Sequence, residues 1–170
     1  MRLWAEGHHE AALTLLTEAA DMGSAQAMKD AGDVAGEMGR RDEARSWYER
    51  SATAGLPDAY VALARAALDS GDEVAAQRWA KLGADAGQTF CMVLYGKQLA
   101  AGPRAGSQSL QQARDYLERA AGLGDVSAAG PLAEVNSRLG DDARARRYIR
   151  MLQDSGNQEE IERLHRLGYL

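Results

Sequence analysis

The chain has 170 residues, 26% of them charged, and a formal net charge of −5. This acidic balance argues against general nucleic-acid binding, because neutralising phosphates requires a basic surface. No apolar run approaches the roughly 18 residues of a membrane span, residues 1–6 lack a signal-peptide core, and the single cysteine, Cys91, permits no internal disulfide. We therefore expect a cytoplasmic protein that binds neither nucleic acid nor membrane.

Glycine recurs along the chain at spacings of 32, 32, 37 and 32 residues, at Gly23, Gly55, Gly87, Gly124 and Gly156. An alanine lies eleven residues before each of these glycines, and a bulky residue lies eight before: Leu15, Trp47, Trp79, Tyr116 and Tyr148. A period of this size is typical of stacked supersecondary units. The sequence predicts an all-α fold, an α-α superhelix in which two-helix repeats form a right-handed solenoid. It also predicts one domain over residues 1–170, with about five repeats and a partial first unit.

We expect ten near-complete helices and no strands, preceded by a helical stub at residues 1–6. Gly7 aligns with the end of a first helix, so the chain begins halfway through a unit and leaves an apolar end uncovered. An uncovered end favours self-association. Two outcomes stay open: a dimer through the N-terminal end, or a monomer in which Leu3 and Trp4 fold back as a cap.

The unit in the middle of the first half shows the pattern most clearly. A first helix is predicted from about 57 to 70, with Ala59, Leu63 and Ala67 on one face, and a second from about 73 to 86. Glycine after each helix supplies a left-handed cap. Acidic pairs recur near the start of the second helices, where they offset the macrodipole: Asp42-Glu43, Asp72-Glu73 and Asp141-Asp142.

Small residues in the first helices predict close helix packing. They lie four residues after the repeated glycines, at Ala27, Ala59, Cys91 and Ala128, and nine after, at Gly32, Ala64, Gly96 and Ala133. Such residues let helix axes approach the short end of roughly 8–10 Å. Cys91 shares this pattern, which predicts a buried small side chain and not a reactive thiol.

Two irregularities break the period. The third unit carries five extra residues, within the Gly/Pro-rich stretch 102–108, which we expect to continue neither helix. That stretch is either a longer connecting loop or a dedicated contact element. Pro131 lies inside a predicted first helix, where it removes a backbone donor. The helix should therefore start late or kink between Ser127 and Leu132, with Ser127 as candidate N-cap.

Residues suited to catalysis are scarce. His8, His9 and Glu10 lie next to Gly7 at a predicted turn, and adjacent histidines project in different directions, unlike an i, i+4 metal pair. A metal-dependent hydrolase at this turn is a minor alternative. We expect no enzyme activity, no catalytic residue, no metal and no cofactor.

Several segments carry a family signature. The stretches Ala44-x-x-Trp47-Tyr48, Ala76-x-x-Trp79 and Ala113-x-x-Tyr116-Leu117 resemble the Sel-1-like signature, and Met92-x-x-Tyr95-Gly96-x-x-Leu99 resembles a tetratricopeptide first helix. The chain is thus similar to the tetratricopeptide and Sel-1-like repeat family. This resemblance implies a protein- or peptide-binding scaffold that uses the concave face of the solenoid. The alternative is a sensor or regulatory module of a larger protein.

The resemblance also implies where a partner binds. In tetratricopeptide proteins the first helices line the groove, and the matching positions here are Lys29, Asp33, Val61, Arg65, Val93, Lys97, Glu134 and Arg166. Arg65 and Lys97 fall in adjacent units, so they predict a basic centre between Asp33 and Glu134 that suits an acidic peptide or carboxylate. The asparagines of the family's carboxylate clamp are missing from these positions.

Overall fold

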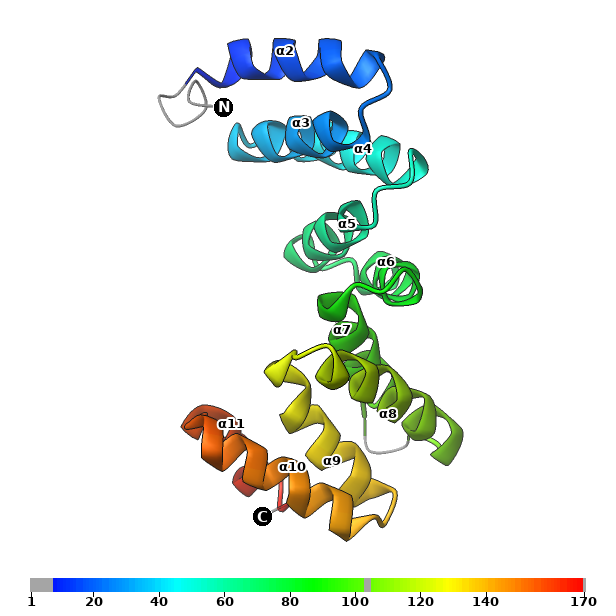
Figure 1. Ribbon diagram of the computed structural model, residues 1–170, viewed down its shortest axis with the longest axis vertical. Helices are drawn as coiled ribbons and strands as arrows, with labels where there is room; N and C mark the ends of the chain where they lie inside the picture. The colour runs from blue at the N-terminus through cyan, green and yellow to red at the C-terminus, as the bar shows by residue number, and fades with distance from the viewer. Residues whose placement is uncertain (1–7, 103–104, 170) are drawn as a thin grey trace. The chain divides into compact units, whose positions relative to one another are not determined.

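The computed structural model describes residues 8–102 and 105–169 (Figure 1). Within these ranges the chain forms ten α-helices and one 3-10 turn, and no strand. The all-α prediction and the number of helices are therefore confirmed, whereas the predicted stub at 1–6 lies outside the described residues. The chain divides into two compact units, Met1–Ala86 and Gly87–Leu170. The expectation of a single domain and of a right-handed stack stays a prediction.

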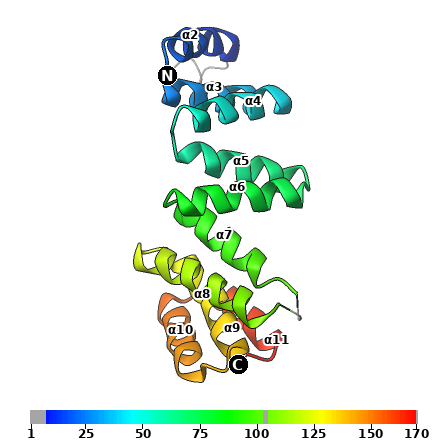
Figure 2. The same ribbon diagram turned by 90° about the vertical axis from the view of Figure 1, so that its right-hand side faces the viewer.

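The first unit contains five helices, and each packs against the next: α2 (His9–Asp21), α3 (Ala25–Glu37), α4 (Arg41–Thr53), α5 (Asp58–Asp69) and α6 (Glu73–Asp85). Figure 2 shows α5 and α6 lying side by side as a helical hairpin. Alanines fill much of the contact between helices: Ala20, Ala31, Ala35, Ala59 and Ala64 are all almost completely buried. The unit is therefore held by close backbone approach and not by a thick aromatic core.

The second unit repeats this arrangement with α7 (Thr89–Leu99), α8 (Ser107–Gly122), the 3-10 turn η1 (Val126–Ala128), α9 (Ala129–Arg138), α10 (Asp142–Ser155) and α11 (Gln158–Arg166). The first helices also contact one another, since α9 touches both α7 and α11. α9 is therefore the helix that links the other two first helices of this unit.

The repeated glycines adopt the left-handed conformation that their spacing predicts. φ lies between 70° and 92° at Gly23, Gly39, Gly55, Gly71, Gly87, Gly124, Gly140 and Gly156. A side chain would strain this conformation, so glycine ends these helices at little cost. An acidic side chain caps the start of two α-helices that follow these glycines. At α6 Asp72 accepts from the Ala75 amide at 2.9 Å, and at α10 Asp141 accepts from the Arg144 amide at 3.0 Å. At α4 the acidic pair lies in the first turn instead, after the N-cap Arg40.

Small residues of the first helices lie where predicted, against the second helix of the same pair. A Cβ atom at Gly32 would lie 2.5 Å from the ring of Tyr48, and one at Gly96 would lie 2.7 Å from Cγ of Leu117. Ala64 and Ala133 hold the same position elsewhere and are fully buried. Cys91 is also fully buried, as its position predicts. The repeated pattern thus reflects direct helix contact.

In two of the second helices, α6 and α8, the bulky residue packs against its own first helix. Trp79 lies 6.3 Å from Tyr60 of α5, and Tyr116 lies 5.2 Å from Tyr95 of α7, measured between ring centroids. Leu15 holds this position in α2 but is 56% exposed.

The helix that contains Pro131 starts late, as predicted. The 3-10 turn η1 comes first, and α9 begins at Ala129, so Pro131 is its third residue. In the first turn of a helix the backbone amides have no carbonyl partner within the helix, so a proline at this position removes no hydrogen bond. The choice of Ser127 as N-cap is wrong, because the Asp125 carboxylate accepts from the Ser127 amide at 3.0 Å and caps the turn.

The extra residues of the third unit form less of a loop than predicted. α8 begins at Ser107, so Ser107 and Gln108 belong to a helix of 16 residues, whereas α6 has 13. The segment from Ser107 to Gln112 lacks glycine and proline, and Leu110 in it is buried. Burial of Leu110 favours an additional turn at the start of α8. Residues 103–104 of the predicted loop lie outside the described residues.

Candidate functional site

Two of the predicted partner-binding residues pair with each other in the first unit. Lys29 and Asp33 lie one turn apart on α3, with Nζ 2.7 Å from Oδ2. The Tyr48 hydroxyl of α4 donates to the other carboxylate oxygen, Oδ1, at 2.9 Å. Burial, followed by the negative charge of Asp33, raises the pKa of Tyr48 above its usual value. Tyr48 therefore remains a donor at neutral pH, and both oxygens of Asp33 are occupied.

The other two predicted residues of the first unit lie one turn apart on α5. Val61 is half-buried and Arg65 is exposed. A buried carboxylate that the sequence analysis did not single out lies on α3, where Asp30 accepts a hydrogen bond from the side-chain amide of Gln26 at 2.8 Å. The i, i+4 spacing of Gln26 and Asp30 is the signal that could have revealed this pair.

In the second unit, α7 carries Val93 and Lys97. Val93 is only 8% exposed, so most of its side chain packs within the unit. Lys97 is exposed and makes no hydrogen bond or ion pair with any residue in the described ranges. Arg166, at the same repeat position on α11, is likewise exposed and without such a partner in the part of the chain that the structure covers. Both cations can therefore interact with a ligand.

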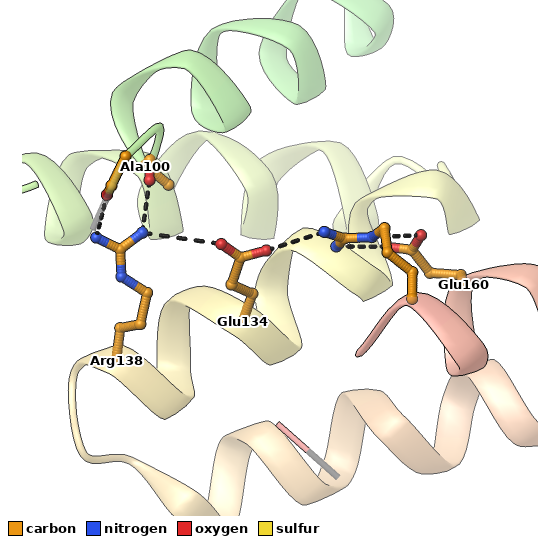
Figure 3. A network of polar contacts seen from close by, with 6 residues as sticks. Ala100, Glu134, Arg138 and Glu160 are labelled. Carbon is orange, nitrogen blue, oxygen red and sulfur yellow. Dashed lines mark hydrogen bonds and ion pairs between the residues drawn. The ribbon is translucent and has the colours of Figure 1, made fainter. Parts of the chain in front are cut away.

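Glu134 occupies this repeat position on α9, but its carboxylate is already engaged. Arg163 Nη1 of α11 lies 3.2 Å from Oε2, and Arg138 Nη1 lies 3.8 Å from Oε1 (Figure 3). Each arginine has further partners. Arg163 donates to both oxygens of Glu160, at 2.9 and 2.8 Å, and Arg138 donates to the carbonyls of Ala100 and Gly102, at 2.5 and 2.8 Å. We call Glu134, Arg138, Glu160 and Arg163 the Glu134 network.

The Glu134 network joins three first helices. Arg138 connects α9 to the end of α7, where it donates to the carbonyl of the C-cap residue Ala100 and to that of Gly102 beyond it. Arg163 connects α9 to α11, and the hydrogen bonds that it donates to Glu160 are the main cause of its raised pKa. The i, i+4 spacing of Glu134 and Arg138 is visible in the sequence. The partnership with Arg163 is not, because it depends on the contact between α9 and α11.

The predicted basic centre stays a prediction, because Arg65 belongs to the first unit and Lys97 to the second. Its predicted acidic neighbours are less available than the sequence suggests. Asp33 is neutralised by Lys29, and Glu134 by arginines. Among the described residues of the second unit, Lys97 and Arg166 are therefore cations without an ion pair, and Glu134, which holds the same repeat position on α9, is a neutralised carboxylate.

The placement of His8, His9 and Glu10 in a turn is wrong for two of the three. His9 and Glu10 are the first residues of α2, and His8 precedes them as N-cap. His9 Nε2 lies 3.1 Å from Glu37 Oε2, and Glu10 forms an ion pair with Arg40. These contacts connect α2 to the end of α3 and to the N-cap residue of α4. Within the described ranges, His, Cys, Asp and Glu side chains form no group of three or more that could hold a metal ion.

None of the described helices is both long and apolar enough to span a membrane. No protein-family model and no curated protein sequence matches the chain.

Solved structures do match, with helical-repeat proteins among them. YrrB, described as a TPR protein with an unusual peptide-binding site, is 16% identical with a TM-score of 0.65, over 96% of this chain and 87% of that one. MamA is 14% identical with a TM-score of 0.61, over 97% and 89%. A MamA double mutant (RS-1 ArsTM) is 15% identical with a TM-score of 0.62, over 93% and 90%. The chain therefore has the tetratricopeptide-type helical-repeat fold.

Proposed function

We propose that the chain is a protein-interaction scaffold that binds a peptide or protein segment on the surface of its first helices. Its fold supports this proposal, since stacked two-helix repeats present an extended row of side chains and the chain resembles TPR proteins throughout its length. One of those proteins is described as having a peptide-binding site. We further propose that the chain acts in the cytoplasm and has no enzymatic activity. Its Sel-1-like signatures suggest, in this proposal, that it is related to Sel-1-like repeat proteins.

The proposed binding residues lie on the first helices of both units: Lys29, Asp33, Val61 and Arg65 in the first, and Val93, Lys97, Glu134 and Arg166 in the second. The observation that carries the proposal is the state of its charges: both carboxylates have cationic partners, whereas Lys97 and Arg166 have none among the described residues. A surface of this kind favours an acidic segment, because each charge-assisted hydrogen bond to a desolvated carboxylate contributes about 1.5–3 kcal/mol.

Charge reversal tests this proposal. Partners are captured from the native host, identified by mass spectrometry, and reduced to synthetic peptides whose affinity is measured. We expect Arg65→Glu combined with Lys97→Glu to abolish binding while the helical circular dichroism signal stays unchanged. The matched control is Arg45→Glu with Arg146→Glu, which makes the same charge change at exposed positions of second helices. Equal affinity of the groove variant and the control would move the site away from the first helices.

A further inference from the structure

Two guanidinium groups converge on the single carboxylate of Glu134. Arg163 approaches one oxygen from α11, at 3.2 Å, and Arg138 approaches the other from the next turn of α9, at 3.8 Å. Figure 3 shows Glu134 lying between them. Two cations around one carboxylate are an arrangement that recognises carboxylates in ligands as well as in side chains.

Each guanidinium has other contacts that fix its position without Glu134. Arg163 is held by a two-pronged pair with Glu160, and Arg138 by the carbonyls of Ala100 and Gly102. Loss of the Glu134 carboxylate would therefore leave two oriented cations facing the vacated position. A preorganised site binds more tightly than one whose side chains must first become ordered.

The position is also accessible. The side chains of Arg138, Glu134 and Arg163 are 14%, 22% and 34% exposed. Glu134 occupies the same repeat position as Lys97 and Arg166, two cations that have no ion pair among the described residues. A ligand that follows the first helices from Lys97 to Arg166 would therefore pass Glu134.

We propose that Arg138 and Arg163 form a carboxylate-binding subsite, and that Glu134 occupies this subsite as an internal competitor until a partner displaces it. The ligand is a carboxylate, either an acidic side chain or a peptide C-terminus. The role of the subsite in peptide binding rests on the proposed function, whereas its affinity for carboxylates does not.

Chemical rescue tests the subsite without any partner. Glu134→Ala vacates the position, and we expect it to lower the Tm of the full chain by about 2–4 °C. Acetate should restore about half of this loss relative to chloride at a matched ionic strength of about 0.1 M. Acetate should not rescue Glu134→Ala combined with Arg163→Gln. It should also leave the control Glu162→Ala unaffected, since Glu162 has no ion pair among the described residues.

The same acetate effect in all of these variants would overturn the proposal, as would the absence of any effect in Glu134→Ala. This test requires that the circular dichroism spectrum of Glu134→Ala match that of the wild type. If it does not, Glu134→Gln replaces it, because the amide keeps the side-chain volume and removes the charge. Glu134→Gln should then bind acetate about tenfold more tightly than the wild type, and equal affinity would contradict the subsite.

Peptides distinguish the two sources of the carboxylate and separate this proposal from the broader one. Acidic peptides with amidated C-termini should bind Glu134→Ala about tenfold more tightly than the wild type if a side chain enters the subsite. If the C-terminal carboxylate of the peptide enters instead, only peptides with an unblocked C-terminus should bind Glu134→Ala more tightly than the wild type. If acetate rescues the Tm but no peptide binds Glu134→Ala more tightly than the wild type, the subsite is confirmed and its place in the proposed function is contradicted.

Discussion

Gly130 of α9 provides the space that the side chain of Glu160 occupies. A Cβ atom at Gly130 would collide with the carboxylate of Glu160 on α11 and with its Cγ and Cδ atoms. Glu160 also holds Arg163 of the same helix by two hydrogen bonds, and Arg163 in turn donates to Glu134 of α9. The absence of one side chain thus allows the polar network that joins the two helices.

Gly130→Ala should therefore destabilise the chain, although alanine favours a helix more than glycine does. The Glu160 side chain would have to move and lose its pair with Arg163, and we expect a cost of about 1–2 kcal/mol in the free energy of unfolding. Urea unfolding measures it. In the Glu160→Ala background the obstacle is gone, and Gly130→Ala should be neutral or stabilising by up to about 1 kcal/mol. An equal cost in both backgrounds would contradict the contact.

Two glycines of α3 provide a matched test of helix packing. Gly32→Ala would force Cβ to within 2.5 Å of the Tyr48 ring and should cost about 1–3 kcal/mol. At Gly36 the nearest atoms lie 3.8 and 3.9 Å away, an ordinary contact, so Gly36→Ala should stabilise the helix by about 0.5–1 kcal/mol. Chemical unfolding of the two variants measures the difference. Similar values for both would show that Tyr48 moves aside easily.

The sequence predicts those parts of this fold that depend on local chemistry. Glycine at a fixed spacing ends helices because few other residues adopt positive φ, and Pro131 delays α9 because its missing amide is tolerated only in a first turn. The same reasoning misplaced the start of α8, where burial of Leu110 favours helix in a stretch that its neighbouring glycines suggested was a loop.

The candidate site was less accessible to prediction, because its state depends on contacts between distant segments. The repeat position of Glu134 is readable from the sequence, but its neutralisation requires Arg163, which is 29 residues away on another helix. Asp33 similarly gains the Tyr48 hydroxyl from α4. A single sequence shows which side chains share a repeat position, but not which of them already have a partner.

Tyr48 should make the free energy of unfolding depend on pH in the alkaline range. Its pKa is raised in the folded chain, mainly by burial, so the folded state retains a proton that the unfolded state releases above pH about 10. Stability from this group is complete below that pH and is lost as the pH rises further, because the folded state then binds more protons than the unfolded state. Tyr48→Phe should cost about 0.5–1.5 kcal/mol at pH 7, for the lost hydrogen bond to Asp33, and less at alkaline pH. Urea unfolding at pH 8 and pH 11 tests this, and parallel losses in wild type and variant would contradict it.

Leu15 identifies the surface through which the chain should self-associate. Equivalent residues of later units pack against a first helix, as Trp79 does against Tyr60, whereas Leu15 is 56% exposed. Burying such a side chain against a second copy contributes about 1.5–3 kcal/mol for each Leu15, so we expect a dimer that light scattering detects at high concentration. Leu15→Glu should weaken it at least tenfold, whereas Val74→Glu, at an exposed apolar position of α6, should leave it unchanged. A monomer at every concentration would instead favour the cap formed by Leu3 and Trp4, which lie outside the described residues, and Trp4→Ala should then induce association.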